Sequence, residues 1–436
     1  MKIAIINHGC AKNLVDSELM AGSLAKDGHR ITLDETSADV VLINTCSFIH
    51  DAETESVQSI VKMIDEGKKV IVTGCLPQKY RKELKKALPE VKAFLGTSEL
   101  DKIGEVVNKI AEESQIYEVA QTPHYHYFEG VERQQITVGA SSYLKIADGC
   151  DCECGYCIIP KLRGKAVSRP MENIVEEAKK LTKKGVTEII LIAQDTTAYG
   201  KDLYGEPSLA KLLSKLCEIK DLGKLRIMYT YPSGITDELL DVIKNNDKIF
   251  DYIDIPLQHS SQSVLKAMRR PAFDYRELVQ KIRNKIPDIA LRTTFIVGYP
   301  GETEEDFEHL RKFIEDIKFD RLGVFEYSRE KGTYSYDLPN QVPAKIKHKR
   351  KNCLMKLQKS ISKKINEGLV GKKIESIVEY ITDDGVVVAR TYKDAPEVDG
   401  LIYLTLKNPE DDVVPGDIVY ATVTKADAYD LYGVIE

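Results

Sequence analysis

Hydrophobic residues in the first 115 positions form short unbroken runs that alternate with amphipathic stretches. The unbroken runs predict buried strands over residues 2–7, 40–45 and 69–74. The amphipathic stretches carry apolar residues at helical spacing and predict helices over residues 13–27, 51–66 and 77–88. Buried strands that alternate with helices are typical of a parallel sheet covered on both faces. Residues 1–115 are therefore expected to form an α/β domain.

A second series of strands and helices follows a segment without periodicity. Residues 116–135 show no hydrophobic period and are expected to be a linker. Beyond them, six apolar runs predict strands over residues 142–148, 188–194, 225–231, 252–258, 291–297 and 321–327. Amphipathic stretches such as 171–184 and 303–317 separate these runs and predict helices. The series predicts a partial (β/α)6 barrel over residues 136–366, with its active site at the carboxyl ends of the strands.

The pattern changes again towards the carboxyl end. Residues 344–365 predict a basic helix. Over residues 367–436, short alternating runs separated by DDG and PGD turns predict a small all-β barrel. The expected fold class is α/β, with an amino-terminal parallel-sheet domain, a central partial TIM-like barrel and a carboxyl-terminal β barrel.

The composition is that of an ordinary globular protein, but its charge is unevenly distributed. The 436 residues are 43% hydrophobic and 30% charged, which excludes global disorder. The net charge of −6 argues against a strongly basic nucleic-acid binder. Residues 370–436 contain 6 basic and 14 acidic residues, a net of −8, which leaves +2 for the rest of the chain.

Nothing in the pattern indicates a membrane segment or an export signal. No apolar run approaches the roughly 18–20 residues of a membrane helix, and no basic-then-apolar leader precedes the first predicted strand. The nine cysteines, an odd number, are expected to be reduced thiols. We therefore expect a cytoplasmic protein with no membrane partner and with metal or redox chemistry at its cysteines.

Three cysteines directly follow the first predicted barrel strand, at a spacing suited to an iron–sulfur cluster. We call Cys150, Cys154 and Cys157 the barrel triplet. Three thiolates can bind three irons of a [4Fe–4S] cluster and leave the fourth iron open. The methionine amino and carboxylate groups of S-adenosylmethionine (SAM) can chelate an open iron of this kind. The alternative is a structural zinc site, but such sites usually have four Cys or His ligands, and no second pair lies nearby.

For two neighbours of the barrel triplet, Cys152 and Tyr156, the sequence allows more than one role. Cys152 offers an alternative ligand set, but the spacing favours the triplet, so Cys152 is expected to be a bystander. Tyr156 either packs near the adenine of SAM or covers the cluster from water.

Three other cysteines share one position relative to the predicted strands of the first domain. Cys10, Cys46 and Cys75, which we call the amino-terminal triplet, each follow a strand end, in NHGC, NTC and TGC. Ligands of parallel α/β sheets gather outside the carboxyl ends of the strands, so the three thiols are expected to converge at one edge. The alternative is three unrelated buried cysteines, because cysteine is commonly buried.

The two triplets, the partial barrel and the flanking domains together resemble the radical SAM methylthiotransferases. The resemblance covers essentially the whole chain. It implies two [4Fe–4S] clusters, one on each triplet, together with SAM, a radical SAM core over residues 136–366 and a TRAM domain over residues 367–436. It also implies that SAM is cleaved to a 5′-deoxyadenosyl radical at the barrel triplet, while the amino-terminal triplet presents a sulfur species that a second SAM has methylated.

Within that family, three segments resemble the enzymes that modify a ribosomal protein. They are AQDTTAYG (193–200), RTYKDAPEVDG (390–400) and the ending GDIVYATVTKADAYDLYGVIE (416–436). This resemblance implies methylthiolation of the β-carbon of an aspartate in the twelfth small-subunit ribosomal protein. The acidic carboxyl-terminal domain suits a basic protein partner, although an acidic face can also serve solubility alone. The alternatives are a tRNA adenosine methylthiotransferase and a noncatalytic iron–sulfur scaffold that binds ribosomes.

Residues near the predicted strand ends are candidates for binding SAM. By the same resemblance, Gln194 and Asp195 stand where the superfamily anchors the SAM amino group. Arg292 is a candidate partner of the SAM carboxylate, with a surface salt bridge as the equal alternative. Gly298 begins the GYPGET turn, where backbone can approach a ligand closely, although an ordinary turn is equally consistent. His259 fits a structural role as well as a functional one.

The expected partners follow from the same hypothesis. They are the basic ribosomal protein, free or on the small subunit, and an external electron donor. The basic stretch 344–365 is a candidate for contact with ribosomal RNA, although a solvated face that covers the barrel is the simpler interpretation. Cys217 and Cys353 lie on predicted helices and are expected to be bystanders.

Overall fold

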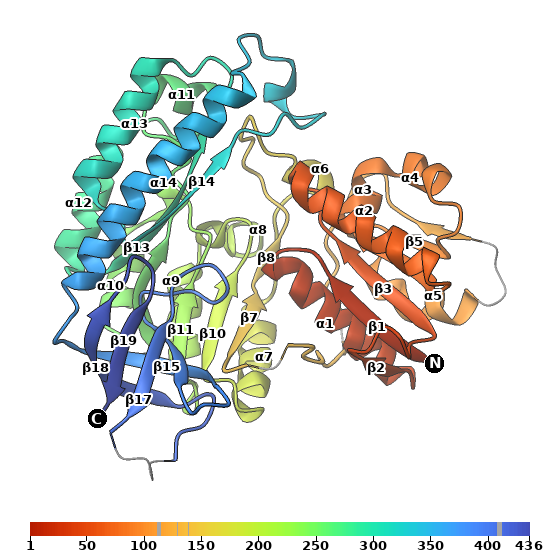
Figure 1. Ribbon diagram of the computed structural model, residues 1–436. Helices are drawn as coiled ribbons and strands as arrows, with labels where there is room; N and C mark the ends of the chain where they lie inside the picture. The colour runs from red at the N-terminus through yellow and green to blue at the C-terminus, as the bar shows by residue number, and fades with distance from the viewer. Residues whose placement is uncertain (111–114, 129, 138, 408–411) are drawn as a thin grey trace.

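The computed structural model describes residues 1–110, 115–128, 130–137, 139–407 and 412–436. An amino-terminal parallel-sheet domain, an open α/β barrel and a small closed β barrel lie side by side (Figure 1). The α/β fold class expected from the sequence is confirmed.

The amino-terminal domain is a six-stranded parallel sheet with the strand order β2-β1-β3-β4-β5-β6. Its strands are β1 (Lys2–Asn7), β2 (Arg30–Thr32), β3 (Val40–Thr45), β4 (Lys69–Gly74), β5 (Ala93–Leu95) and β6 (Ile116–Glu118). Its helices are α1 (Ala11–Lys26), α2 (His50–Asp65), α3 (Cys75–Tyr80), α4 (Lys82–Ala87), the 3₁₀ turn η1 (Leu100–Lys102) and α5 (Ile103–Lys109). The three predicted strands are confirmed. β2, β5 and β6 were not predicted, because three residues are too few to show a period.

Two expectations for this domain need correction. The single helix predicted over 77–88 is two helices, because Arg81 adopts a positive φ of 49° that interrupts the helical backbone. The segment 116–135 is not a linker throughout, since its first three residues form β6 at the sheet edge. Residue 129 of that segment lies outside the described residues.

The central part is an open parallel sheet with the order β7-β10-β11-β12-β13-β14. These strands are β7 (Ser141–Lys145), β10 (Glu188–Ile192), β11 (Lys224–Ile227), β12 (Ile249–Asp254), β13 (Ala290–Val297) and β14 (Arg321–Glu326). The helices of this part are α6 (Ile159–Arg163), α7 (Met171–Lys183), α8 (Lys201–Tyr204), α9 (Leu209–Cys217), α10 (Asp237–Lys244), α11 (Gln262–Ala267), α12 (Tyr275–Lys285) and α13 (Glu304–Ile317), with 3₁₀ turns η2 (Thr196–Ala198), η3 (Pro232–Gly234) and η4 (Tyr334–Asp337). All six predicted strands are present, several of them shorter than expected.

The first predicted barrel strand, 142–148, is divided in two. After β7 the chain forms β8 (Ala147–Asp148), which pairs antiparallel with β9 (Val167–Ser168). This small hairpin closes the ends of the loop over residues 149–166, which carries the barrel triplet.

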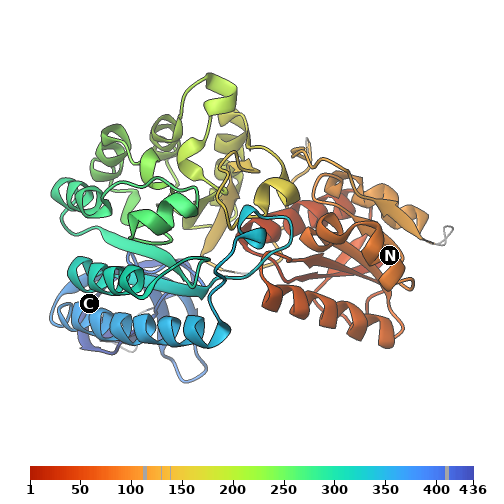
Figure 2. The same ribbon diagram turned by 90° about the horizontal axis from the view of Figure 1, so that it is seen from above.

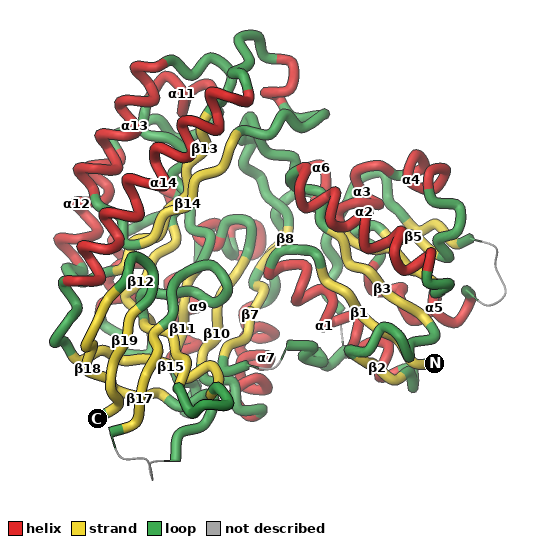
Figure 3. Tube along the Cα trace, in the orientation of Figure 1, coloured by secondary structure: helices red, strands yellow, loops and turns green. Residues whose placement is uncertain are grey.

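The carboxyl-terminal part begins after the long basic helix α14 (Ala344–Glu367), which packs along α13 and β14 (Figure 3). Its strands are β15 (Lys373–Ile381), β16 (Val387–Thr391), β17 (Ile402–Leu406), β18 (Ile418–Ala426) and β19 (Leu431–Ile435). They form a closed barrel with the order β15-β16-β17-β19-β18 around a core that includes Val378, Leu404 and Val423. The predicted small β barrel is confirmed.

The three parts share buried interfaces. One hydrophobic cluster contains Leu19 of α1, Ile190 of β10 and Ile377 of β15, so a single apolar core joins all three. Helix α1 lies between its own sheet and β7 and is buried along most of its length (Figures 1 and 2). Its buried polar residues therefore need partners in the barrel.

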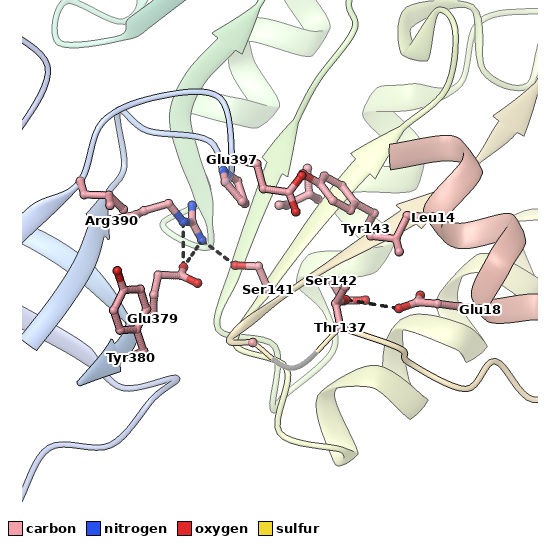
Figure 4. Close-up of a pocket in the computed structure, with 14 residues that line it drawn as sticks. Leu14, Glu18, Thr137, Ser141, Ser142, Tyr143, Glu379, Tyr380, Arg390 and Glu397 are labelled. Carbon is pink, nitrogen blue, oxygen red and sulfur yellow. Dashed lines mark hydrogen bonds and ion pairs between the residues drawn. The ribbon is translucent and has the colours of Figure 1, made fainter. Parts of the chain in front are cut away.

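Charged side chains join the barrel to the carboxyl-terminal domain. Glu188 of β10 accepts from Arg226 Nε of β11 at 2.6 Å and from Arg390 Nη2 of β16 at 2.5 Å. All three side chains are at most 2% exposed. Arg390 also contacts Ser141 and Glu379 beside a pocket of about 210 Å³ where α1, β7 and β15 meet (Figure 4). The pocket holds none of the cysteines.

We expect acid to weaken this junction. Burial raises the pKa of Glu188, but Arg390 and Arg226 outweigh it and hold the pKa at about 2. A carboxyl group whose pKa is lower in the folded state stabilises the fold above its unfolded pKa of about 4.3, and this contribution is lost as the pH falls towards 2. The shift is worth about 3 kcal/mol of unfolding free energy. As the pH is lowered from ~5.5 to ~3, the midpoint temperature of unfolding should therefore fall less in Glu188→Gln than in the unmodified protein.

The same variant should also be less stable at neutral pH, because it leaves buried arginines without their carboxylate; a loss of about 3–5 kcal/mol is expected. Glu308→Gln removes an exposed carboxylate paired with Arg311 and is the matched control. Equal pH dependence in Glu188→Gln and the unmodified protein would contradict this account.

Candidate active site

The barrel triplet lies on a tightly closed loop at the carboxyl end of β7. Cys150 N–H donates to Gly164 O at 3.1 Å, and Cys157 N–H donates to Cys154 O at 3.0 Å. Gly149 has a φ of 79°, and a Cβ there would lie 2.0 Å from Lys165 O, so only glycine fits. Asp148 Oδ1 accepts from Gly149 N–H at 2.9 Å and holds the entry to the loop.

A buried arginine that sequence reasoning missed contacts this loop. Arg270 Nη1 lies 3.8 Å from Cys154 Sγ, Nη2 donates to Pro256 O at 2.5 Å, and the guanidinium stacks 4.3 Å from the Tyr231 ring centroid. A cation beside sulfur stabilises its thiolate form. No sequence pattern pointed to this contact, because Arg270 follows α11, more than a hundred residues from Cys154.

Cys152 and Tyr156, the two neighbours of the barrel triplet in the sequence, both contact its cysteines. Cys152 N–H donates to Cys150 Sγ at 3.4 Å, and its hydrogen-bonded contact with Cys150, followed by burial, raises the pKa of the Cys152 thiol. Tyr156 packs against the hydrophobic cluster that contains Met268 and Tyr299, and its hydroxyl lies beside Cys154. The bystander role of Cys152 stays a prediction.

Gln194 and Asp195 lie just after β10, and their side chains have different partners. Gln194 Nε2 donates to Asp148 Oδ1 at 2.6 Å, while its buried Oε1 has no hydrogen-bond partner among the described residues. This carbonyl oxygen is free to accept from an ammonium group such as that of SAM. Asp195 instead caps η2, where its Oδ1 accepts from Thr197 N–H at 2.9 Å and from Ala198 N–H at 3.3 Å.

Arg292 is engaged in salt bridges at the junction with the carboxyl-terminal domain. Arg292 is the third residue of β13, five residues before the strand's carboxyl end. It pairs with Asp254 at 2.9 Å and with Asp399 of the carboxyl-terminal domain at 3.3 Å. Its guanidinium therefore joins two domains, which favours the salt-bridge alternative, and its pairing with the SAM carboxylate stays a prediction.

Gly298 and His259 have local structural contacts. Gly298 has a φ of 76°, its N–H donates to Glu302, and a Cβ would lie 2.3 Å from Lys347 Cγ. These contacts favour the ordinary-turn interpretation of GYPGET. His259 is buried and its Nδ1 accepts from Ser261 N–H at 3.0 Å. Burial lowers the pKa of His259 to about 3, so the ring is neutral.

The amino-terminal triplet sits at the carboxyl ends of three adjacent strands, as predicted. Cys10 is the N-cap of α1 after β1, Cys46 follows β3 and Cys75 begins α3 after β4. Gly74 has a φ of 92°, and a Cβ there would lie 2.4 Å from Asn44 Oδ1, so the backbone packs closely beneath the triplet.

The three thiols influence one another electrostatically. Burial raises the pKa of Cys75 to about 12, and Cys46 and Cys10 act in the same direction against Arg163. Cys10 is accessible to solvent but closely surrounded by protein atoms; this desolvation raises its pKa, yet Lys12 and Arg163 outweigh it and lower the pKa overall. The structure thus brings the amino-terminal triplet together.

The two triplets are neighbours across the domain interface. Cys75 packs against Ile158 and Leu162, which belong to the segment directly after Cys157. Thr97 of the amino-terminal domain donates to Leu162 O at 2.6 Å in the same contact. The edge of the first sheet therefore faces the mouth of the barrel.

The donor chemistry fits two iron–sulfur clusters. All nine cysteines are free thiols, and each triplet offers three soft sulfur ligands. In the part of the chain that the structure describes, no three His, Cys, Asp or Glu side chains converge on a point that could hold one metal ion. Ligands of a four-iron cluster each bind a different iron, so they need no such convergence.

An open (β/α)6 barrel with a three-cysteine loop, flanked by a second cysteine triplet and a small β barrel, defines a radical SAM methylthiotransferase. Family models match the same three parts. Residues 2–96 match Uncharacterized protein family UPF0004, residues 144–314 match the Radical SAM superfamily and residues 370–435 match the TRAM domain.

Full-length relatives narrow the class. The ribosomal protein uS12 methylthiotransferase RimO of Lachnoclostridium phytofermentans is 46% identical, over 100% of both chains, and that of Caldanaerobacter subterraneus subsp. tengcongensis is 48% identical, over 99% of both. The protein of the same name from Geobacter sulfurreducens is 44% identical over 100% of this chain and 98% of the relative. The chain belongs to this family, the RimO methylthiotransferases.

Solved structures share the fold at low sequence identity. The radical SAM methyltransferase TsrM from Kitasatospora setae has a TM-score of 0.55 and 14% identity, over 74% of this chain and 72% of that chain. The cobalamin-dependent SAM radical enzyme OxsB has a TM-score of 0.51 and 12% identity, over 81% of this chain and 56% of that chain. None of the helices within the described residues is long and apolar enough to cross a membrane.

Proposed function

We propose that this protein replaces a hydrogen on the β-carbon of an aspartate in ribosomal protein uS12 with a methylthio group. The relatives that carry this activity in their name are 44–48% identical over essentially the whole chain. The observation that carries the proposal is the contact between Cys75 and the segment after Cys157, because it brings the two cysteine triplets close together across the domain interface.

The radical SAM family implies SAM and one [4Fe–4S] cluster, which the barrel triplet would hold. We propose that the amino-terminal triplet holds a second. When bound, SAM and its cluster supply a carbon radical able to remove hydrogen from an unactivated carbon.

The chain's own residues bind and orient these groups. Arg270 places a buried cation beside Cys154, and the free Oε1 of Gln194 is available to the SAM ammonium group. An aspartate β-carbon is too weak an acid for a side-chain base to ionise at neutral pH, which agrees with a mechanism that uses no general base.

The charge of the carboxyl-terminal domain favours a protein substrate less strongly than the sequence alone indicates. Three acidic residues of this domain form salt bridges with basic residues of the barrel: Glu375 with Lys224, Asp394 with Arg321 and Asp399 with Arg292. Part of the domain's net charge of −8 is therefore neutralised at its junction with the barrel. The remaining acidic surface still suits a basic protein better than a phosphate backbone.

We propose two further partners. One is an external electron donor. The other is ribosomal RNA, at an exposed stripe of lysines on α14: Lys345, Lys349, Lys356, Lys359 and Lys363. In the described structure only Lys363 of this stripe forms a salt bridge, with Glu367 at 3.9 Å. Each free lysine is available to a phosphate. A cytoplasmic location is part of this proposal.

A parallel assay separates the candidate functions. The anaerobically reconstituted enzyme, methyl-labelled SAM and a reductant are incubated either with ribosomal protein uS12 or with tRNA. We expect label in the protein and none in the tRNA, together with 5′-deoxyadenosine. Label in tRNA alone would identify a tRNA methylthiotransferase, and the absence of 5′-deoxyadenosine would identify a noncatalytic scaffold.

A further inference from the structure

A buried group of charged side chains lies between the two triplets. We call it the interdomain charge cluster, and it consists of Asp16 of α1, Lys145 of β7, Asp148 of β8 and Arg163 of α6. Every one of these side chains is at most 3% exposed. Two carboxylates face two cations, so the cluster is electrically balanced, as buried charges must be.

Arg163 makes the contacts that cross the domain interface. Its Nη1 lies 2.7 Å from both Asp16 Oδ2 and Asp148 Oδ2, and its Nη2 donates to Asn13 Oδ1 at 2.8 Å. Lys145 Nζ contacts the same two carboxylates, at 2.9 Å in the case of Asp148. One planar guanidinium therefore binds groups of both domains at once.

On the amino-terminal side, the contacts continue to the first triplet. Asn13 Oδ1, which accepts from Arg163, also accepts from Cys10 Sγ at 3.5 Å. Asn13 Nδ2 donates to the carbonyl of Thr45, the residue before Cys46, at 3.1 Å. A single amide thus joins Arg163 to two of the three cysteine-bearing segments.

On the barrel side, the contacts continue to the second triplet. Asp148 Oδ1 accepts from the N–H of Gly149, the residue before Cys150, and from Gln194 Nε2 at 2.6 Å. Arg163 itself ends the helix that follows Cys157. A continuous set of hydrogen bonds therefore runs from Cys10 to the loop of the barrel triplet and to Gln194.

A second buried arginine at the same interface provides a comparison. Arg133 pairs with Glu18 of α1 at 2.9 Å and with Glu177 of α7 at 3.0 Å, and its side chain is 3% exposed. It joins the same two domains but contacts neither cysteine loop. Arg133 already joins the two domains, so domain contact alone does not explain why a second arginine, Arg163, lies between the triplets.

We propose that Arg163 is a positioning residue, which fixes the amino-terminal triplet relative to the barrel triplet and so sets the path for sulfur transfer. This inference rests on the proposed function. Arg163 acts through Asn13, through Asp148 and through its own hydrogen bond with Cys75.

Arg163→Lys tests the proposal, because lysine keeps the charge but cannot bind three groups in a planar fork. In the full-length, reconstituted enzyme we expect methylthio transfer to fall by roughly 10–100-fold, since small misplacements have effects of this size. SAM cleavage to 5′-deoxyadenosine should stay within about twofold of the unmodified enzyme. Arg133→Lys is the matched control and should keep both activities within about twofold.

A spectroscopic measurement separates positioning from general destabilisation. In a background with Cys150, Cys154 and Cys157 replaced by alanine, the electron paramagnetic resonance signal that remains after one-electron reduction with dithionite belongs to the amino-terminal cluster. Arg163→Lys should change that signal and Arg133→Lys should not. Asn13→Ala, which leaves the four charges paired, should reproduce the effect and replaces Arg163→Lys if that variant does not fold.

The outcomes are distinct. Equal transfer rates and equal spectra in Arg163→Lys and Arg133→Lys would overturn the positioning role, as would an Asn13→Ala variant with unchanged transfer. Failure of the unmodified enzyme to transfer the methylthio group to uS12 would contradict the proposed function instead.

Discussion

Replacing Cys10, Cys46 or Cys75 with alanine will abolish methylthio transfer while SAM cleavage continues. The amino-terminal triplet lies on a separate sheet domain, so its loss leaves the loop over residues 149–166 and its closing hairpin intact. Transfer should fall by at least roughly 1,000-fold, because the transferred sulfur would lose its binding site. Iron content should fall from about eight to about four atoms per chain. Methylthiolated product, 5′-deoxyadenosine and iron are measured on the same reconstituted samples.

Cys353→Ala is the matched control for these variants. Cys353 lies on α14, is half-buried and packs against the barrel core far from both triplets. It should keep full transfer and iron content. Retained transfer in Cys10→Ala would refute the assignment of a second cluster to the amino-terminal triplet.

Replacing Cys154 with alanine will abolish both SAM cleavage and methylthio transfer. Cys154 is the barrel cysteine that contacts Arg270, and a cluster with two remaining thiolates lacks the ligands that a site-differentiated [4Fe–4S] cluster requires. Production of 5′-deoxyadenosine should fall below detection, while about four irons stay on the amino-terminal triplet.

Cys152→Ala is the control for this second prediction, since it removes a thiol from the same loop. It should keep both activities, because the spacing assigns ligation to its neighbours. Loss of SAM cleavage in Cys152→Ala, or its survival in Cys154→Ala, would show that the ligand set is different.

The sequence was sufficient to predict the elements that carry the cysteines. β1, β3 and β4 are long unbroken apolar runs, and a cysteine after each of three such strands must lie at the same edge of a parallel sheet. The three cysteines of the barrel triplet lie close together in the sequence, so their spacing alone was enough to predict a cluster-binding loop. Neither prediction required knowledge of how the domains pack.

The contacts between domains could not be predicted in the same way. Arg270 and Cys154 are 116 positions apart, and Arg163 and Asn13 are 150 apart. Such pairs have no sequence period, because tertiary packing alone brings them together. The contact between Arg292 and Asp399 is of the same kind, because the two residues are 107 positions apart and belong to different domains.

Helix α1 shows how packing overrides a surface pattern. Its residues Asn13, Asp16 and Glu18 would face solvent on an isolated amphipathic helix, yet all are buried against the barrel. Each has a charged or amide partner across the interface, as buried polar groups require.

Mass spectrometry of ribosomal protein uS12 tests the central claim most directly. The protein is incubated with the reconstituted enzyme, SAM and a reductant, digested, and its aspartate-containing peptides are fragmented. We predict a mass increase equal to the replacement of one hydrogen by a methylthio group, located on one aspartate. An unmodified protein, under conditions in which 5′-deoxyadenosine accumulates, would contradict the account.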